Sequence, residues 1–527
     1  MIGLANRTKF IEENQNTIFD LIVIGGGITG AGILLDASSR GKKCLLIEKN
    51  DFASGTSSKS TKLIHGGLRY LKNLEFKMVS DVGRERNIAF RNAPHLVRPE
   101  KMLIPLYKKK GFKKWQLSIA LKLYDILANV RKKDRRKILS RKATLKLESK
   151  LNGEKLIGGG YYAEYRTDDA RLTISLIKTA KQYNAGAINY MEVKTINKTE
   201  NFNISCFDHV YQKNITLHSK NLINATGPWA DKTRLLQNEK FTSNIHLSKG
   251  IHIVVSKEVL PLKQALYYTM EDDRMCFAIP RGTVTYIGTT DDDYHGNIND
   301  IKISNEEVKY LINGANKVFN SSILEPKHVI SSWAGLRPLI KEPGKKSTEI
   351  SRKDEIFLSK SGMISIAGGK LTGYRLMAKK AVDMIDKKNQ CKTHLIAVDG
   401  NFNNDYESYQ ALKVHLCNEF EIDKLTSDYL IQNYGTNAIS ILKDFKSNDN
   451  NLLICCELKY CIDHEGVNTL LDFYVRRTGL MYFNPIQIEK SLDKVVEFYN
   501  NTISKYGIEK ADKNLILEEL KASKNFI

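Results

Sequence analysis

The chain has 527 residues, too many for one ordinary domain, and 42% of them are hydrophobic, enough for a large buried core. Its 27% charged residues and 10 prolines are typical of globular proteins and exclude a largely disordered chain. The net charge of +22 is concentrated in residues 101–146, which carry 16 lysines and arginines against two aspartates. Such a segment favours anionic lipid, nucleic acid or a phosphorylated substrate, and the alternative is a solvated basic surface.

The eight cysteines lack the paired spacing of a zinc site or a redox motif, so we expect reduced thiols in the cytoplasm and assign no metal ligands. Residues 1–19 contain two glutamates and no apolar core with a cleavage site, so we expect no signal peptide. No apolar run reaches the roughly 18 to 20 residues that span a bilayer, and we therefore expect no transmembrane helix.

The first predicted elements form a βαβ unit. A β-branched run over 19–24 ends abruptly in glycines and predicts a buried strand. A helix is predicted from about Thr29 to Arg40, and a second short apolar strand over 43–48. Strand, glycine turn, helix and strand in this order indicate a parallel sheet.

The glycine turn of this unit has the spacing GxGxxG, with Gly25, Gly27 and Gly30 at the glycine positions. Glycines there allow a tight turn, close approach of a pyrophosphate, and packing of the helix on the sheet. Glu48 ends the second strand, 18 residues after Gly30, where a carboxylate can accept hydrogen bonds from ribose hydroxyls. These four residues predict a dinucleotide site. The alternative is a glycine-rich turn without a ligand.

The basic segment contains an apolar stripe at helical spacing, made of Phe112, Trp115, Ile119, Leu123, Ile126 and Val130. Lysines stand alongside the stripe, and residues 131–137 are mostly basic. Such a helix favours contact with an anionic membrane surface. The alternative is an ordinary helix whose apolar stripe faces the core.

Strands and helices alternate again near 173–183, 220–225 and 363–366, which indicates an α/β core assembled from distant segments. From Tyr406 to Ile527 the sequence has helical periodicity, many Lys, Glu and Asn, and few glycines. This periodicity and composition predict a separate C-terminal helical domain.

Six further stretches closely resemble, in order, motifs of the FAD-dependent glycerol-3-phosphate dehydrogenases. They are TSSKSTKLIHGGLRY (56–70), NATGPW (224–229), SKGIHIVV (248–255), IGTTD (287–291), GLRPL (335–339) and GGKLTGYR (368–375). Residues 463–465 and 472–478 resemble the helical domain of that family. The resemblance covers nearly the whole chain.

The resemblance implies an α/β fold with a glutathione-reductase-like FAD-binding Rossmann domain, an inserted β-sheet substrate domain and a C-terminal α-helical domain. We expect the FAD-binding domain over about 15–110, 160–245 and 355–395. The substrate domain then covers about 111–159 and 246–354, and the helical domain 396–527. The implied reaction oxidises sn-glycerol 3-phosphate to dihydroxyacetone phosphate by hydride transfer to N5 of FAD, with a membrane quinone as the electron acceptor.

FAD contacts are expected from four segments: Gly25, Gly27, Gly30 and Glu48; Thr56, Ser57 and Ser58; Gly227; and Gly368, Gly369, Leu371 and Thr372. The turn at 225–227 follows a strand and suits close approach to the dinucleotide, although it could be a simple strand-end turn. Residues 368–372 lie between a strand and a helix, where amides can stabilise negative charge on the reduced flavin. Their alternative role is a structural helix cap.

Five residues are candidates for catalysis. Arg69 and Arg337 could clamp the substrate phosphate, since guanidinium groups bind phosphate at two points, but each could instead form an internal salt bridge. His252 stands in an alternating strand, from which it would project toward a cavity and act as base or orient the hydroxyl, unless it is structural. His65 is a second candidate base or a residue that orders the cofactor loop. Lys370 could contact the substrate or flavin N1.

The sequence also bears on other electron acceptors and partners. Oxidase relatives that pass electrons to oxygen typically carry an added internal segment, which is not found here. An amine or amino-acid oxidase would share the FAD motifs but need no phosphate clamp. The sequence has no RRM, KH or zinc-finger signature, so no nucleic-acid partner is expected. We expect a cytoplasmic protein attached peripherally to the inner face of the cell membrane through 101–146, and a homodimer is left open.

Overall fold

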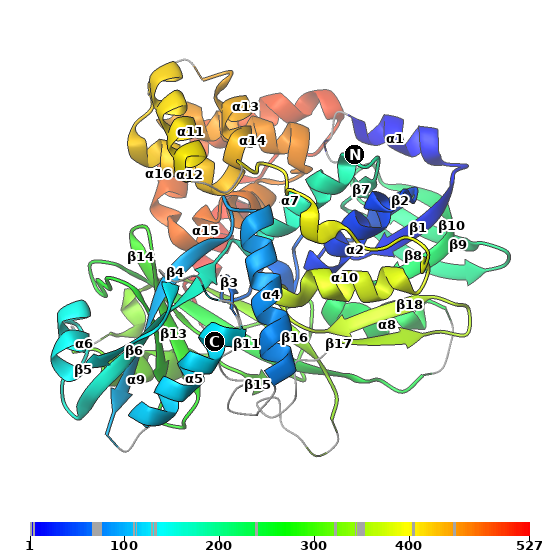
Figure 1. Ribbon diagram of the computed structural model, residues 1–527. Helices are drawn as coiled ribbons and strands as arrows, with labels where there is room; N and C mark the ends of the chain where they lie inside the picture. The colour runs from blue at the N-terminus through cyan, green and yellow to red at the C-terminus, as the bar shows by residue number, and fades with distance from the viewer. Residues whose placement is uncertain are drawn as a thin grey trace.

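The structure is a computed structural model with two β-sheets and a group of C-terminal helices (Figure 1). In Figure 1 the first sheet lies at the right, the second at the lower left, and the C-terminal helices gather at the upper left. The structure describes residues 3, 6–65, 76–108, 111, 113–127, 130, 134–237, 241–320, 324–342, 344, 354–402, 406–445 and 450–526.

The first sheet runs in the order β17-β18-β10-β1-β2-β7, with β9 paired to β10 and β8 paired to β9. Its strands are β1 (Ile18–Ile24), β2 (Cys44–Ile47), β7 (Gly186–Ile188), β8 (Met191–Lys198), β9 (Phe202–Asp208), β10 (Lys213–Asn224), β17 (Asp354–Leu358) and β18 (Ile364–Gly368). Parallel pairing joins β18, β10, β1, β2 and β7, as the βαβ pattern predicts. The carboxyl ends of these strands therefore meet at one edge of the sheet.

Both faces of the first sheet are covered, which explains why β1 is apolar on both sides. Leu21 and Val23 pack into a core shared with four helices. These helices are α2 (Ile28–Ser39), α4 (Phe76–Asn92), α7 (Asp169–Lys181) and α10 (Tyr374–Asp383). Ile22 and Ile24 pack into a second core with residues of β8 and β9 on the other face.

The second sheet runs in the order β15-β11-β14-β13-β12-β4-β6-β3, with β16 paired to β11 and β5 to β6. Its strands are β3 (Leu63–Ile64), β4 (Arg98–Tyr107), β5 (Lys137–Ser140), β6 (Leu156–Arg166), β11 (Ile245–Ser256), β12 (Ala265–Thr269), β13 (Met275–Arg281), β14 (Val284–Gly288), β15 (Asp292–Asp293) and β16 (Val329–Ile340). Helices α5 (Lys114–Leu127), α6 (Arg141–Leu147) and α9 (Asn305–Val318) belong to this half.

Two strands of the second sheet, β4 and β6, join segments that are distant in the sequence. β4 pairs with β6 along its whole length, from Arg98 with Arg166 to Tyr107 with Leu156. β4 and most of β6 lie in the ranges expected for the FAD-binding domain, about 15–110 and 160–245. Strand pairing between distant segments decides the sheet, and local sequence patterns do not carry that information. The division into domains stays a prediction.

The C-terminal part is helical, as predicted. It comprises α11 (Tyr406–Glu419), α12 (Lys424–Tyr434), α13 (Ala438–Leu442), α14 (Asn450–Glu465), a short π-helix η9 (Asp472–Arg477), α15 (Leu480–Phe483), α16 (Pro485–Ile503) and α17 (Lys513–Ala522). It shares one hydrophobic core with the second sheet, since Tyr482 and Phe483 pack against Trp333 of β16. The helices are therefore not a free-standing unit.

Helix α5 has two opposite apolar sides, because about 100° separates successive residues of a helix. The side that packs on β6 consists of Leu117, Leu121 and Tyr124, all fully buried. The other side consists of Trp115, Ile119 and Ile126, whose exposed fractions are 61%, 58% and 66%. Of the stripe identified in the sequence, Trp115, Ile119 and Ile126 face away from the core, whereas Leu123 packs against the core and Val130 is buried in it. Phe112, the remaining member, and residues 131–133 of the basic run lie outside the described residues. No helix in the described ranges is long and apolar enough to cross a bilayer.

Candidate active site

A cavity of about 2080 Å³ lies between the two sheets. It opens at the carboxyl ends of β1, β2, β10 and β18, where Gly25, Glu48, Ala225 and Gly368 line it, and Arg337 of β16 lines it from the second sheet. Ligands of doubly wound α/β sheets bind at this edge. The volume exceeds the roughly 300 to 1,000 Å³ of ordinary small-ligand pockets, as a dinucleotide with a substrate would require.

The glycine turn at the start of α2 is packed too tightly for side chains. A Cβ on Gly25, whose φ is +111°, would lie 2.6 Å from the carbonyl oxygen of Ala225. A Cβ on Gly30 would lie 1.9 Å from the carbonyl oxygen of Gly25, so Gly30 lets the helix approach the turn and does not itself line the cavity. Gly25 and Gly27 do line it, beside the N-terminus of α2. This cradle fits the pyrophosphate of FAD.

Glu48 holds the glycine turn in place. Its carboxylate accepts hydrogen bonds from the N–H groups of Gly26 at 2.6 Å and Asn50 at 2.9 Å. Burial raises the pKa of Glu48, an effect that these two hydrogen bonds oppose. The residue lines the cavity where a ribose would lie, and it orders the backbone as well.

The short helical turn η2 (Thr56–Ser58) brings two of its three predicted FAD residues to the cavity. The Thr56 hydroxyl donates to the carbonyl of Leu336 at 2.6 Å, which ties this loop to the second sheet. The Ser57 hydroxyl accepts from the N–H of Ile28 at 2.9 Å, in the first turn of α2. Ser58 is buried in the protein and does not line the cavity.

The remaining predicted FAD residues come from the ends of β10 and β18. Gly227, Gly368 and Gly369 all have positive φ and line the cavity together with Leu371. Thr372 is buried and does not line it; its hydroxyl donates to the carbonyl of His65 at 3.2 Å. This hydrogen bond joins residues 368–372 to the motif at 56–70.

Arg337 lines the cavity and is held by an internal ion pair. Its guanidinium donates to the Asp291 carboxylate at 3.1 Å, to the Thr289 hydroxyl at 2.8 Å and to the carbonyl of Thr290 at 3.1 Å. The salt bridge left open as an alternative is therefore present, and the side chain still faces the cavity. His65 and Lys370 also line the cavity, whereas Arg69 lies outside the described residues.

His252 does not project into the cavity, which corrects the expectation from the sequence. Its ring is fully buried and stacks on Trp333 with centroids 4.7 Å apart. Nε2 lies 3.0 Å from the hydroxyl of Thr61, and Thr61 is the residue on the cavity wall. Among the described residues Nδ1 has no hydrogen-bond partner. Burial lowers the pKa of His252 well below its ordinary value, so the imidazole is neutral.

Sequence reasoning passed over Thr61 and Asp291. Both stand inside motifs of the family, Thr61 in 56–70 and Asp291 in 287–291. A hydroxyl next to Ser60 gives no distinctive signal, and the partner of Arg337 becomes visible only when β11, β15 and β16 are paired.

Comparisons with known proteins agree with this geometry. Residues 20–375 match the FAD dependent oxidoreductase family, and residues 391–505 match the C-terminal domain of alpha-glycerophosphate oxidase. The aerobic glycerol-3-phosphate dehydrogenase of Bacillus subtilis (strain 168) is 42% identical over 513 residues, 93% of this chain and 92% of that protein. The Staphylococcus aureus (strain USA300) enzyme of the same name is 43% identical over 514 residues, with the same coverage.

Two solved structures are also similar. The glycerol-3-phosphate dehydrogenase from Bacillus halodurans complexed with FAD superimposes with a TM-score of 0.84 at 36% identity, covering 100% of this chain and 99% of the other. L-alpha-glycerophosphate oxidase from Mycoplasma pneumoniae shares the fold, with a TM-score of 0.58 at 19% identity over 74% of this chain and 98% of the other. The predicted fold class and cofactor are confirmed. The chain belongs to the FAD-dependent oxidoreductases and, within them, to the aerobic glycerol-3-phosphate dehydrogenase family.

Proposed function

We propose that the protein oxidises sn-glycerol 3-phosphate to dihydroxyacetone phosphate and passes the two electrons to a membrane quinone. The observation that carries the proposal is one cavity that is lined both by the FAD cradle and by His65, Arg337 and Lys370. FAD, when bound, supplies the acceptor for the hydride that leaves carbon 2 of the substrate. The hydroxyl proton must leave to a base, and the phosphate needs cationic partners.

Arg337 is our candidate for the phosphate. Its ion pair with Asp291 fixes the guanidinium from one side, and the cavity-facing side is where a phosphate oxygen would bind. A fixed guanidinium loses less conformational entropy on binding than a mobile lysine. Lys370 lines the same cavity, between Gly369 and Leu371 of the predicted flavin-binding segment, and could contact the substrate or flavin N1. Arg69 stays a prediction.

Two histidines remain candidates for the base. His65 lines the cavity directly. His252 is linked to the cavity wall by its hydrogen bond with Thr61, so a proton would reach Nε2 by way of the Thr61 hydroxyl. A neutral imidazole can accept that proton, and its stacking on Trp333 keeps the ring in one orientation.

We propose that α5 attaches the protein peripherally to the inner face of the membrane. Its exposed apolar side, defined by Trp115, Ile119 and Ile126, fits insertion among lipid headgroups, and neighbouring lysines and arginines fit anionic lipid. Trp115 and Ile119 also line the cavity. A quinone dissolved in the bilayer would thus find an apolar path to the site.

Anaerobic stopped-flow absorbance tests the reaction. Purified protein mixed with glycerol 3-phosphate should lose the oxidised flavin band, and an added quinone analogue should restore it. Restoration by oxygen at a comparable rate would assign the oxidase reaction instead. A flavin that glycerol 3-phosphate leaves oxidised, but that amino acids reduce, would refute the proposal.

A further inference from the structure

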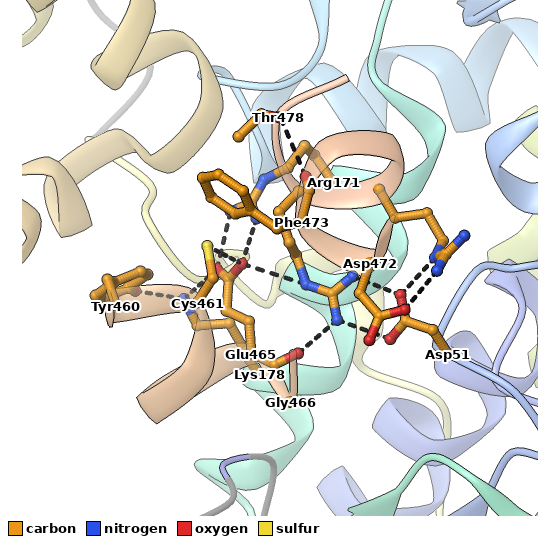
Figure 2. Close-up of polar contacts among 12 residues, drawn as sticks. Asp51, Arg171, Lys178, Tyr460, Cys461, Glu465, Gly466, Asp472, Phe473 and Thr478 are labelled. Atoms are coloured by element: carbon orange, nitrogen blue, oxygen red, sulfur yellow. Dashed lines mark hydrogen bonds and ion pairs between the residues drawn. The ribbon is translucent and has the colours of Figure 1, made fainter. Parts of the chain in front are cut away.

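Asp51 joins the FAD-binding loop to the C-terminal helices. It follows Glu48 by three residues, in the loop between β2 and η2, and its carboxylate is fully buried. Oδ1 accepts from Arg477 at 2.8 Å, and Oδ2 accepts from Arg476 at 2.5 Å and Arg477 at 2.8 Å (Figure 2). Asn189 also donates to Oδ1, at 3.0 Å. A buried carboxylate is costly unless it is paired in this way.

The loop around Asp51 holds both peptide groups of Gly26. Glu48 accepts from the Gly26 N–H at 2.6 Å, and the N–H of Ala53 donates to the Gly26 carbonyl at 3.0 Å. Gly26 lies between the two glycines that line the cavity. A shift of Asp51 is therefore transmitted to the glycine turn by a few covalent bonds and two hydrogen bonds.

The two arginines are themselves anchored from several sides. Arg477 donates to the carbonyl of Glu465 at 2.7 Å, and Arg476 donates to Asp472 at 2.6 Å. The Glu465 carboxylate in turn binds Arg171 and Lys178 of α7 (Figure 2). These ion pairs form one buried network whose described side chains balance in charge. Its four acids and four bases are Asp51, Asp399, Glu465 and Asp472, and Arg171, Lys178, Arg476 and Arg477.

The anchoring element is a π-helix, η9, which is a rare backbone form found mostly at functional positions. Its last two residues point at Asp51, while its first residue, Asp472, accepts from the hydroxyl of Tyr190 at 2.7 Å. Tyr190 also donates its backbone N–H to the carbonyl of Asn50 at 3.0 Å. Arg476 and Arg477 of η9 thus hold the loop at the Asp51 carboxylate, and Tyr190, which contacts η9, holds it at its backbone.

We propose that Arg476 and Arg477 are positioning residues for FAD. Through Asp51 they hold the loop from 48 to 58, and with it the glycine turn, in the conformation that receives the ribose and pyrophosphate. The proposal gives the C-terminal helices a role in cofactor retention. It rests on the family's cofactor and not on the proposed substrate or acceptor.

FAD release from the holoenzyme tests the proposal. Arg477→Lys keeps the charge but loses the two-point contact with Asp51, and Arg476→Gln removes the second contact. After dilution of each holoenzyme, recovery of free-flavin fluorescence gives the release rate and the Kd. We expect both variants to bind FAD at least tenfold more weakly than the wild type. In buffer saturated with FAD, their KM for glycerol 3-phosphate should return to within twofold of the wild-type value.

Lys178→Met is the matched control. It breaks the same buried network at Glu465 and Tyr460 but has no contact with Asp51. It should lower the unfolding temperature and release FAD within twofold of the wild-type rate. The proposal is overturned if both arginine variants retain FAD like the wild type, or if Lys178→Met releases FAD as fast as they do. Asp51→Asn adds a third measurement if it folds, and the two arginine variants decide if it does not.

Discussion

Replacing the exposed apolar side of α5 should release the protein from membranes. The triple variant Trp115→Ser, Ile119→Ser and Ile126→Ser removes three side chains that are about 60% exposed and contribute little to the core. Full burial of a large apolar side chain is worth about 1.5 to 3 kcal/mol, so each has roughly 1 to 2 kcal/mol left to gain in lipid. Together they contribute about 3 to 6 kcal/mol, or roughly two to four orders of magnitude in partitioning.

Sedimentation with anionic vesicles over a salt series measures this loss. Salt screens the contribution of the lysines and arginines but leaves apolar insertion intact. We therefore expect the wild type to stay partly bound at high salt and the triple variant to dissociate at moderate salt. The fold of the variant should be unchanged, because α5 packs on β6 through its other side, and its flavin content is measured on the same samples because Trp115 and Ile119 also line the cavity.

The matched control carries Leu358→Ser, Leu395→Ser and Leu425→Ser. These leucines are 63%, 68% and 82% exposed, and they lie on β17, on the turn at 393–395 and on α12. The control removes a comparable apolar area without touching α5, so it should bind vesicles like the wild type. Equal binding of both triple variants would refute the assignment of α5 as the membrane-facing surface.

Three further predictions concern the site and its stability. Gly30→Ala places a Cβ 1.9 Å from the Gly25 carbonyl oxygen and should yield protein with less than about a tenth of the wild-type flavin content, whereas Gly373→Ala, with open space around its Cβ, should keep it. Arg337→Ala should raise the KM for glycerol 3-phosphate by about tenfold or more while the flavin spectrum is unchanged; an unaltered KM would remove Arg337 from the phosphate site. Burial raises the pKa of Glu457 from 4.5 to about 7, so the folded state keeps a proton that the unfolded state loses. The free energy of unfolding should therefore fall between pH 4.5 and 7, by at most about 3 kcal/mol, and denaturant titrations of Glu457→Gln should lack this component.

Local signals predicted the start of the fold well. β1, α2 and β2 begin and end within about a residue of the expected positions, because glycines and β-branched runs mark these boundaries within a few residues of sequence. Parallel pairing then brings the strand ends to one edge, so most predicted FAD residues do line one cavity. Three of the predicted residues do not line the cavity and pack behind the residues that do: Gly30, Ser58 and Thr372.

Non-local contacts explain what the sequence did not reveal. The alternation of β11 shows that His252 and its neighbours face opposite sides, but Thr61 and Trp333, from distant segments, decide what His252 contacts. In α5 two apolar stripes coexist, and periodicity alone does not tell which one the core covers. The pair of Asp51 with Arg477 spans 426 residues and has no local signal.

The strand order of the first sheet also bears on how the protein is made. β1 is complete at residue 24, but its neighbour β10 ends at 224 and β18, the next strand outward, ends at 368. At about 5 to 20 residues per second, a ribosome needs roughly 10 to 40 s to add the chain between the ends of β1 and β10. During that interval β1 has an open edge, which is a site for wrong pairing between nascent chains. FAD cannot meet its complete cradle until Gly368 has left the ribosome, so the cofactor joins a chain whose synthesis is more than two-thirds finished.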